Sequence, residues 1–232
     1  MISKTCVILL TIAVFKYAQK TKDLPIVKEL SPIFISGLVI IFLLKIFHID
    51  YSIYKSGATF FTYLLIPATI ALGYPLYKNM SLLTKNKRVV YVAFLLSAII
   101  ALLSTFVTGK LSHADIQLII SMLPKSITAP MAVEASKELG GIPELTACVV
   151  VLTGIFGAIF GHKILSLINI KNDVAIGIAI GASSHVIGTS KCIEKGKEKQ
   201  VVMSTLSLVV VGILTVAIAP IIWKLILMLI HR

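Results

Sequence analysis

Two short polar segments interrupt a sequence that is otherwise apolar enough for a membrane. Residues 124–130 read PKSITAP, and residues 181–190 read GASSHVIGTS. Each segment follows a short apolar stretch and precedes another stretch with helical character. A bilayer offers no water to freed backbone groups, so non-helical chain persists there only inside protein or along a cavity. A matched pair of such interruptions predicts a solute-binding site.

The rest of the chain predicts an all-α integral membrane protein. Of the 232 residues, 57% are hydrophobic and 14% are charged, and the mean hydropathy is +0.99. A soluble domain would have about a quarter charged residues. We predict about six full spans plus two broken or re-entrant helical elements. The uncharged runs that locate the spans are residues 5–15, 30–44, 56–77, 89–107, 145–161 and 201–223.

The net charge of +12 comes from 22 basic and 10 acidic residues. The basic residues cluster between apolar runs, as the positive-inside rule expects, so we predict a bilayer partner and no nucleic acid. The three cysteines, Cys6, Cys148 and Cys192, are isolated. Their spacing predicts neither a metal site nor a disulfide framework. We expect no cofactor.

The second half of the chain reads as one unit written twice: half helix, polar break, half helix, full span. The predicted repeats are residues 111–168 and 169–232, and we assign residues 1–110 to N-terminal scaffold and oligomerisation helices. Each broken element either crosses the membrane, which makes the repeats parallel, or returns as a hairpin, which makes them inverted. Transporters use inverted repeats more often, so we expect inversion. The distribution of basic residues barely separates the two topologies.

The breaks combine features that bind a small anion. Helix N-termini carry partial positive charge and free N–H groups, and Thr128 before Pro130 is a candidate cap. Lys125 adds an ammonium group and His185 an imidazole. We therefore predict a carboxylate site at the two breaks. The predicted binding residues are Lys125, Ser126, Thr128, Ser183, Ser184, His185, Gly188, Thr189 and Ser190.

Other interpretations of the same residues stay open. Lys125 can instead snorkel to an interface, and His185 is either a neutral core residue or a proton carrier. Glu134 is a second proton-coupling candidate, although a pair with Lys137 three residues later is favoured. Structural roles fall to Pro124, Pro130 and Gly181 at the breaks, and to Pro67, where we expect a kinked or broken helix. No hydrolase, metalloprotease or phosphate-loop motif is present, so we predict no enzyme.

Four stretches resemble the LrgB/CidB family. They are LPKSITAPMA at residues 123–132, LGGIPELTA at 139–147, ASSHVIGT at 182–189 and LIPATIALGYPLY at 65–77. The family often has Ala-Ser-His where this chain has Ser183-Ser184-His185, and it differs around Ile127 and Thr128. Neither departure removes a polar function. The resemblance extends over essentially the whole chain.

The resemblance implies two functional pictures. One is an antiholin-like regulator of murein hydrolase activity and autolysis that acts with a small LrgA/CidA-type membrane partner. The other, implied by plastid glycolate/glycerate translocators and bacterial pyruvate carriers, is a transporter of small monocarboxylates. The residues of the breaks favour transport, which we expect to be proton-coupled. We also expect a homo-oligomer, a dimer, in the bacterial cytoplasmic membrane.

Overall fold

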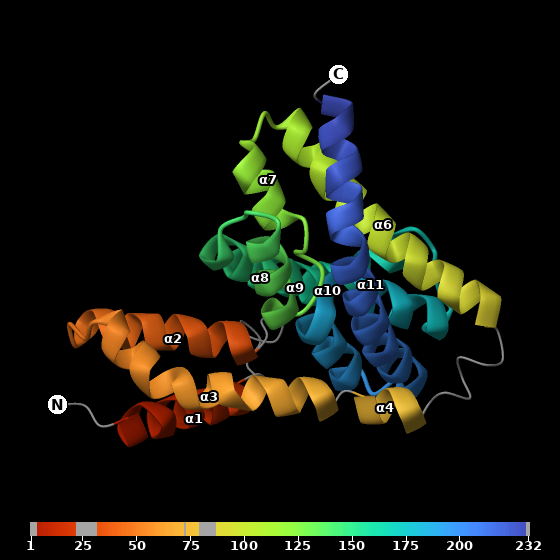
Figure 1. Ribbon diagram of the computed structural model, residues 1–232. Coiled ribbons are helices and arrows are strands. Elements are labelled where there is room, and N and C mark those ends of the chain that lie inside the picture. Colours follow the sequence, from red (N-terminus) through yellow and green to blue (C-terminus); the bar gives the residue numbers. More distant parts are fainter. Residues whose placement is uncertain (1–3, 22–31, 72, 79–86, 231–232) are drawn as a thin grey trace. The chain divides into compact units, whose positions relative to one another are not determined.

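The computed structural model describes residues 4–21, 32–71, 73–78 and 87–230. Throughout these residues the secondary structure is helical, with no strand (Figure 1). The chain divides into two compact units, Met1–Ala71 and Leu72–Arg232. The division of roles predicted between residues 1–110 and 111–232 stays a prediction, although the helix Lys87–Leu111 packs with the helices Asp173–Glu194 and Glu198–Ile230 in the second unit.

In its described residues, the first unit contains three helices, α1 (Lys4–Lys20), α2 (Pro32–Ile46) and α3 (Tyr51–Ala71), and α1 contacts both of the others. We expected a kinked or broken helix at Pro67; α3 continues through this residue to Ala71, so the helix is not broken there, and the kink stays a prediction. Because proline has no N–H group, the carbonyl one turn earlier loses its hydrogen bond within the helix. A membrane helix tolerates this lost bond where neighbouring groups bond to the carbonyl instead.

The second unit contains α4 (Gly73–Lys78), α6 (Lys87–Leu111), α7 (Ile116–Met122), α8 (Ala129–Glu138), α9 (Pro143–Leu167), α10 (Asp173–Glu194) and α11 (Glu198–Ile230). Helices α10 and α11 form the most extensive pairing, and α10 also packs against α9 (Figure 1). Two apolar clusters join α6 to α11. One contains Phe94 and Leu206. The other contains Leu102 and Trp223, and this second cluster also includes residues of α7.

Three of the described helices are long and apolar enough to cross a membrane: residues 88–111, 143–167 and 198–228. The chain is therefore a helical membrane protein, with three such helices in the described residues rather than the six full spans predicted. The run at 5–15 lies in α1, and the described part of the run at 30–44 lies in α2, but these helices have only 17 and 15 residues. A perpendicular span needs about 20.

The first polar segment separates two helices. Residues 123–128 are non-helical between α7 and α8. The side chain of Asp115 caps α7, and Thr128 occupies the N-cap position of α8 ahead of Pro130. Three hydroxyl-bearing residues then hold the start of α9 against both short helices: Thr146 Oγ1 donates to the Ser121 carbonyl at 2.8 Å and to Ser136 Oγ at 2.7 Å.

The second polar segment contains a kink rather than a long non-helical stretch. We expected residues 181–190 to separate two helices; they lie inside α10, which consists of two helices joined across a kink at His185, its one residue with non-helical dihedral angles. Gly181, expected at the edge of a break, instead lies where α10 passes close to the backbone of Ser204 on α11. Serine and threonine hydroxyls in α10 bond to carbonyls three or four residues earlier, which satisfies these polar groups inside the helix.

Candidate functional site

A pocket of about 470 Å³ lies within the second unit, between α6, the link at residues 123–128, α9 and α10. Small-molecule sites in proteins commonly have this size. Lys125 and Ser126 enter it from the first polar segment, and Ser183 and Ser184 enter it from the second. The two segments that the sequence singled out, almost sixty residues apart, therefore line one cavity.

Lys125 is the one charged side chain on the wall of this pocket. Its Nζ donates to Thr105 Oγ1 on α6. Thr105 is buried and donates its own proton to the Ala101 carbonyl at 2.7 Å, so its oxygen remains available as an acceptor. Among the described residues, no carboxylate forms an ion pair with Lys125. An ammonium group has three donors, and two of them remain for a ligand.

Hydroxyl-bearing residues from four elements line the same pocket as Lys125. Ser97 and Ser104 come from α6, Ser126 from the link, Thr153 from α9, and Ser183 and Ser184 from α10. Ser183 Oγ donates to the Ala179 carbonyl at 2.7 Å, and its oxygen lies 3.0 Å from Ser184 Oγ. Phe156, Ile164 and Leu165 supply an apolar wall. The pocket thus has a cationic, hydroxyl-rich part and an apolar part.

At the kink in α10, Ser184 and His185 pack closely against glycines of α9. A Cβ atom on Gly154 would lie 2.6 Å from His185 Cε1, and one on Gly157 would overlap the side chain of Ser184. His185 has φ 42° and ψ −137°, a backbone conformation that disfavours a non-glycine residue. Its ring is buried, and Nε2 lies 2.9 Å from the Val150 carbonyl, which can only accept, so Nε2 carries a proton.

The remaining predicted site residues lie away from the pocket. Thr189 Oγ1 donates to the His185 carbonyl at 2.9 Å, and Ser190 Oγ donates to the Ile187 carbonyl at 2.7 Å. The helix resumes directly after His185, so Thr189 and Ser190 lie past its start and bond to carbonyls of the preceding residues instead of capping free amides. Gly188 packs beside Ser184 and Ile180. Their expected role in binding stays a prediction.

Three further candidates have distinct surroundings. Thr128 is buried at the N-cap of α8, where its hydroxyl makes no capping bond and has no hydrogen-bond partner. Pro124 lies in the non-helical link just before Lys125. Glu134 is exposed on α8 and does not line the pocket. The favoured pair with Lys137 is not formed between these two described residues.

The sequence interpretation missed the contribution of α6, which we treated only as a span. Ser97, Ala101 and Ser104 follow one another at intervals of four and three residues, the spacing of one helix face. Thr105 adjoins that face and accepts the bond from Lys125. A stripe of small and polar residues on an otherwise apolar span was the available signal.

The chain matches the LrgB-like family over residues 11–225. It belongs to this family. It is 34% identical over 217 residues to the uncharacterized protein YxaC of Bacillus subtilis, covering 93% of this chain and 94% of that protein. It is 30% identical over 214 residues to the holin-like protein CidB of Staphylococcus aureus, covering 92% and 93%. No solved structure shows significant similarity to the chain.

The LrgB-like proteins that match include several named holin-like. Membership of the family confirms the resemblance noted in the sequence. The family match and the three long apolar helices together identify the chain as a helical membrane protein with bacterial relatives.

Proposed function

We propose that this LrgB-like protein transports small monocarboxylates across the bacterial cytoplasmic membrane, in which it is a multi-pass protein. The observation that carries the proposal is Lys125, a cation without a carboxylate partner among the described residues, in a pocket rich in hydroxyl groups. A carboxylate would supply the missing negative charge. Charge-assisted hydrogen bonds of this kind are about twice as strong as neutral ones.

The pocket also suits the rest of such a substrate. The hydroxyls of Ser126, Ser183 and Ser184 can bond the keto or hydroxyl oxygen of pyruvate, glycolate or glycerate. A single lysine matches one carboxylate and leaves a second one without a counter-charge, which favours monocarboxylates over dicarboxylates. Coupling to protons belongs to the proposal, with His185 and Glu134 as the candidate carriers.

Uptake into proteoliposomes tests the proposal. Pyruvate, lactate and glycolate uptake is measured for the wild type, Lys125→Ala, Lys125→Arg and His185→Ala, with and without an LrgA/CidA-type partner and an imposed pH gradient. We expect Lys125→Ala to abolish uptake and Lys125→Arg to retain part of it. Lys110→Ala, in the last turn of α6, is the control and should behave as wild type.

The transport proposal is wrong if none of the three acids enters under any of these conditions, or if Lys125→Ala transports like the wild type. The second candidate function rests on the relatives named holin-like protein CidB. It is an antiholin-like regulator of murein hydrolase activity, acting with the small partner and as a homo-oligomer. That function predicts leakage of unrelated dyes from the same vesicles, with no dependence on Lys125.

A further inference from the structure

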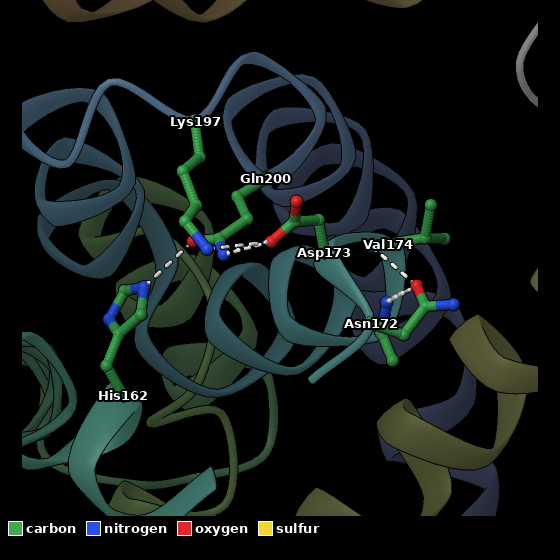
Figure 2. A network of polar contacts seen from close by, with 7 residues as sticks. His162, Asn172, Asp173, Val174, Lys197 and Gln200 are labelled. Atoms are coloured by element: carbon green, nitrogen blue, oxygen red, sulfur yellow. Dashed lines mark hydrogen bonds and ion pairs between the residues drawn. The ribbon is translucent and has the colours of Figure 1, made fainter. Parts of the chain in front are cut away.

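A chain of hydrogen bonds links α9, α10 and α11 beside the pocket (Figure 2). His162 Nε2 on α9 lies 3.0 Å from Gln200 Oε1 on α11. Gln200 Nε2 donates to Asp173 Oδ1 at the start of α10, at 2.7 Å. Lys197 Nζ donates to the same carboxylate oxygen at 3.2 Å. Gln200 is buried, with 1% of its surface exposed, so its amide depends on these two partners.

The direction of each bond fixes the tautomer of His162. Asp173 is a carboxylate and can only accept, so the NH₂ group of Gln200 must point toward it. Gln200 therefore offers its carbonyl oxygen to His162, and His162 Nε2 must carry a proton. In the neutral ring, Nδ1 then bears the lone pair. That atom is buried and has no hydrogen-bond partner.

A second proton on His162 has no favourable place in this arrangement. It would attach to Nδ1, where a buried N–H without an acceptor is costly. The positive charge would also face Lys191, Lys195 and Lys197 from the end of α10 and the turn after it. Lys191 is ion-paired with Glu194 at 3.2 Å, and Lys197 with Asp173, so two of the three are partly compensated.

We propose that His162, Gln200 and Asp173 form a proton-responsive lock, closed when His162 is neutral and opened when Nδ1 is protonated. The closed arrangement accommodates one ring proton, and an open one lets water bond the second. Lowering the pH therefore favours the open state. The lock is at the end of the helices where Lys197 is more than half exposed, so protons reach it from solvent.

Asp173 does not titrate in the same range. Its hydrogen bond from Gln200, and then that from Lys197, hold the pKa of this carboxyl below its ordinary value. Asp173 is therefore charged throughout the pH range in which a histidine changes charge. An opening seen between mild alkaline and mild acid pH belongs to His162.

Cys192 is a built-in reporter of opening. It is fully buried on α10, in a cluster with Ile176 and Ile180 against Leu165 of α9 and Val201 of α11. The other two cysteines, Cys6 and Cys148, are exposed and can be replaced by serine. The test follows the reaction of Cys192 with 4,4′-dithiodipyridine in the purified full chain, with rates normalised to the denatured protein at each pH.

We expect the normalised rate to rise at least about threefold between about pH 8 and about pH 5.5, since one linked proton changes a population by up to about tenfold per pH unit. His162→Gln keeps the bond to Gln200 without a titrating group and should remove the rise. His113→Gln, an exposed histidine, is the control and should keep it. A rate independent of pH in the wild type, or a rise that persists in His162→Gln, overturns the lock.

Gln200→Glu provides a second variant that distinguishes the lock from a general loosening of the fold. A glutamate at this position would repel Asp173 at high pH and pair with a protonated His162 at low pH. The direction of the pH effect on Cys192 should therefore reverse. An unchanged direction contradicts the proposal. Because the readout is a thiol reaction, the lock can stand or fall independently of transport.

Discussion

At the scale of single residues, Thr105 controls where Lys125 presents its charge. The threonine oxygen holds Nζ at the α6 wall of the pocket. We expect Thr105→Val to raise the substrate concentration for half-maximal uptake by roughly tenfold, because a hydrogen bond to a charged group contributes about 1.5–3 kcal/mol. The maximal rate should change much less.

The matched control is Thr108→Val, one turn further along α6, whose hydroxyl bonds only to carbonyls of its own helix. This variant should leave both uptake parameters near wild type. Equal effects of the two substitutions would remove Thr105 from its positioning role and attribute the change to helix packing.

Gly157 is the residue where α9 meets the hydroxyl pair of α10. A methyl group there would overlap Ser184, and overpacking a tight contact costs about 1–3 kcal/mol. We expect Gly157→Ala to lower the thermal midpoint by about 2–4 °C per kcal/mol, followed by circular dichroism in detergent. Gly37→Ala on α2 is the control: the added Cβ has open space around it, so the thermal midpoint should not change.

At the scale of helices, two of the N-caps in the second unit, Asn172 and Thr128, differ in a way that a stability measurement can detect. Asn172 Oδ1 accepts from the amides of Val174 and Ala175 at the start of α10, whereas Thr128 makes no such bond at the start of α8. Replacing a capping residue by alanine costs about 1 kcal/mol.

Asn172→Ala should therefore destabilise the protein by about 1 kcal/mol, and Thr128→Ala should have the smaller effect in the same denaturation experiment. A larger loss from Thr128→Ala would mean that its hydroxyl has a partner in the membrane that the isolated chain lacks.

Helix boundaries could be predicted where the sequence pattern of proline, capping and apolar residues determines them. The polar segment at residues 124–130 and the candidate cap Thr128 ahead of Pro130 located the non-helical link and the start of α8 within a few residues. The second break was predicted too long, because glycine, serine and threonine resemble a loop in sequence, whereas only His185 is non-helical there. In α10 the hydroxyls bond within the helix and the glycines face neighbouring helices. Only the packing of the folded chain shows whether such a segment forms a loop or a helix.

The same dependence on packing explains which site residues could be predicted from the sequence. Lys125 and the serines could be named from sequence because an unpaired lysine and clustered hydroxyls are unusual in apolar chain. Thr105 could not, since a threonine in a membrane helix most often bonds its own backbone. His162 also escaped notice, because its role depends on Gln200 and Asp173, which are 38 and 11 residues away in the chain.

At the scale of the whole molecule, the sidedness of the second unit can be tested. His162 is bonded to Gln200, and Lys195 lies near enough to influence its charge. The residues Lys163 and Lys195 therefore belong to the same end of the unit. Ser136, close to Lys137, is bonded to Thr146 at the opposite end of α9. A helix of the length of α9 spans about 37 Å, more than the roughly 30 Å of a bilayer core.

We expect cysteines substituted for Lys163 and Lys195 to react with an impermeant maleimide from one side of the membrane, and a cysteine at Lys137 from the other. The native cysteines are replaced by serine for this experiment. Labelling of Lys163 and Lys195 from opposite sides would contradict the packing of α9 against α10 and α11 and would favour crossing over hairpin topology.

The lone lysine of the pocket has a consequence for the membrane voltage. Binding of a monocarboxylate lowers the charge of the pocket by one, from one uncompensated positive charge to neutral, and a coupled proton taken up by His185 would restore the positive charge. Moving a unit charge across a membrane potential of 100 mV changes its free energy by about 2.3 kcal/mol. The electric field would therefore act on the return of the empty carrier, and it would act on the loaded carrier only when a proton accompanies the substrate, so the voltage dependence of the loaded step would report proton coupling.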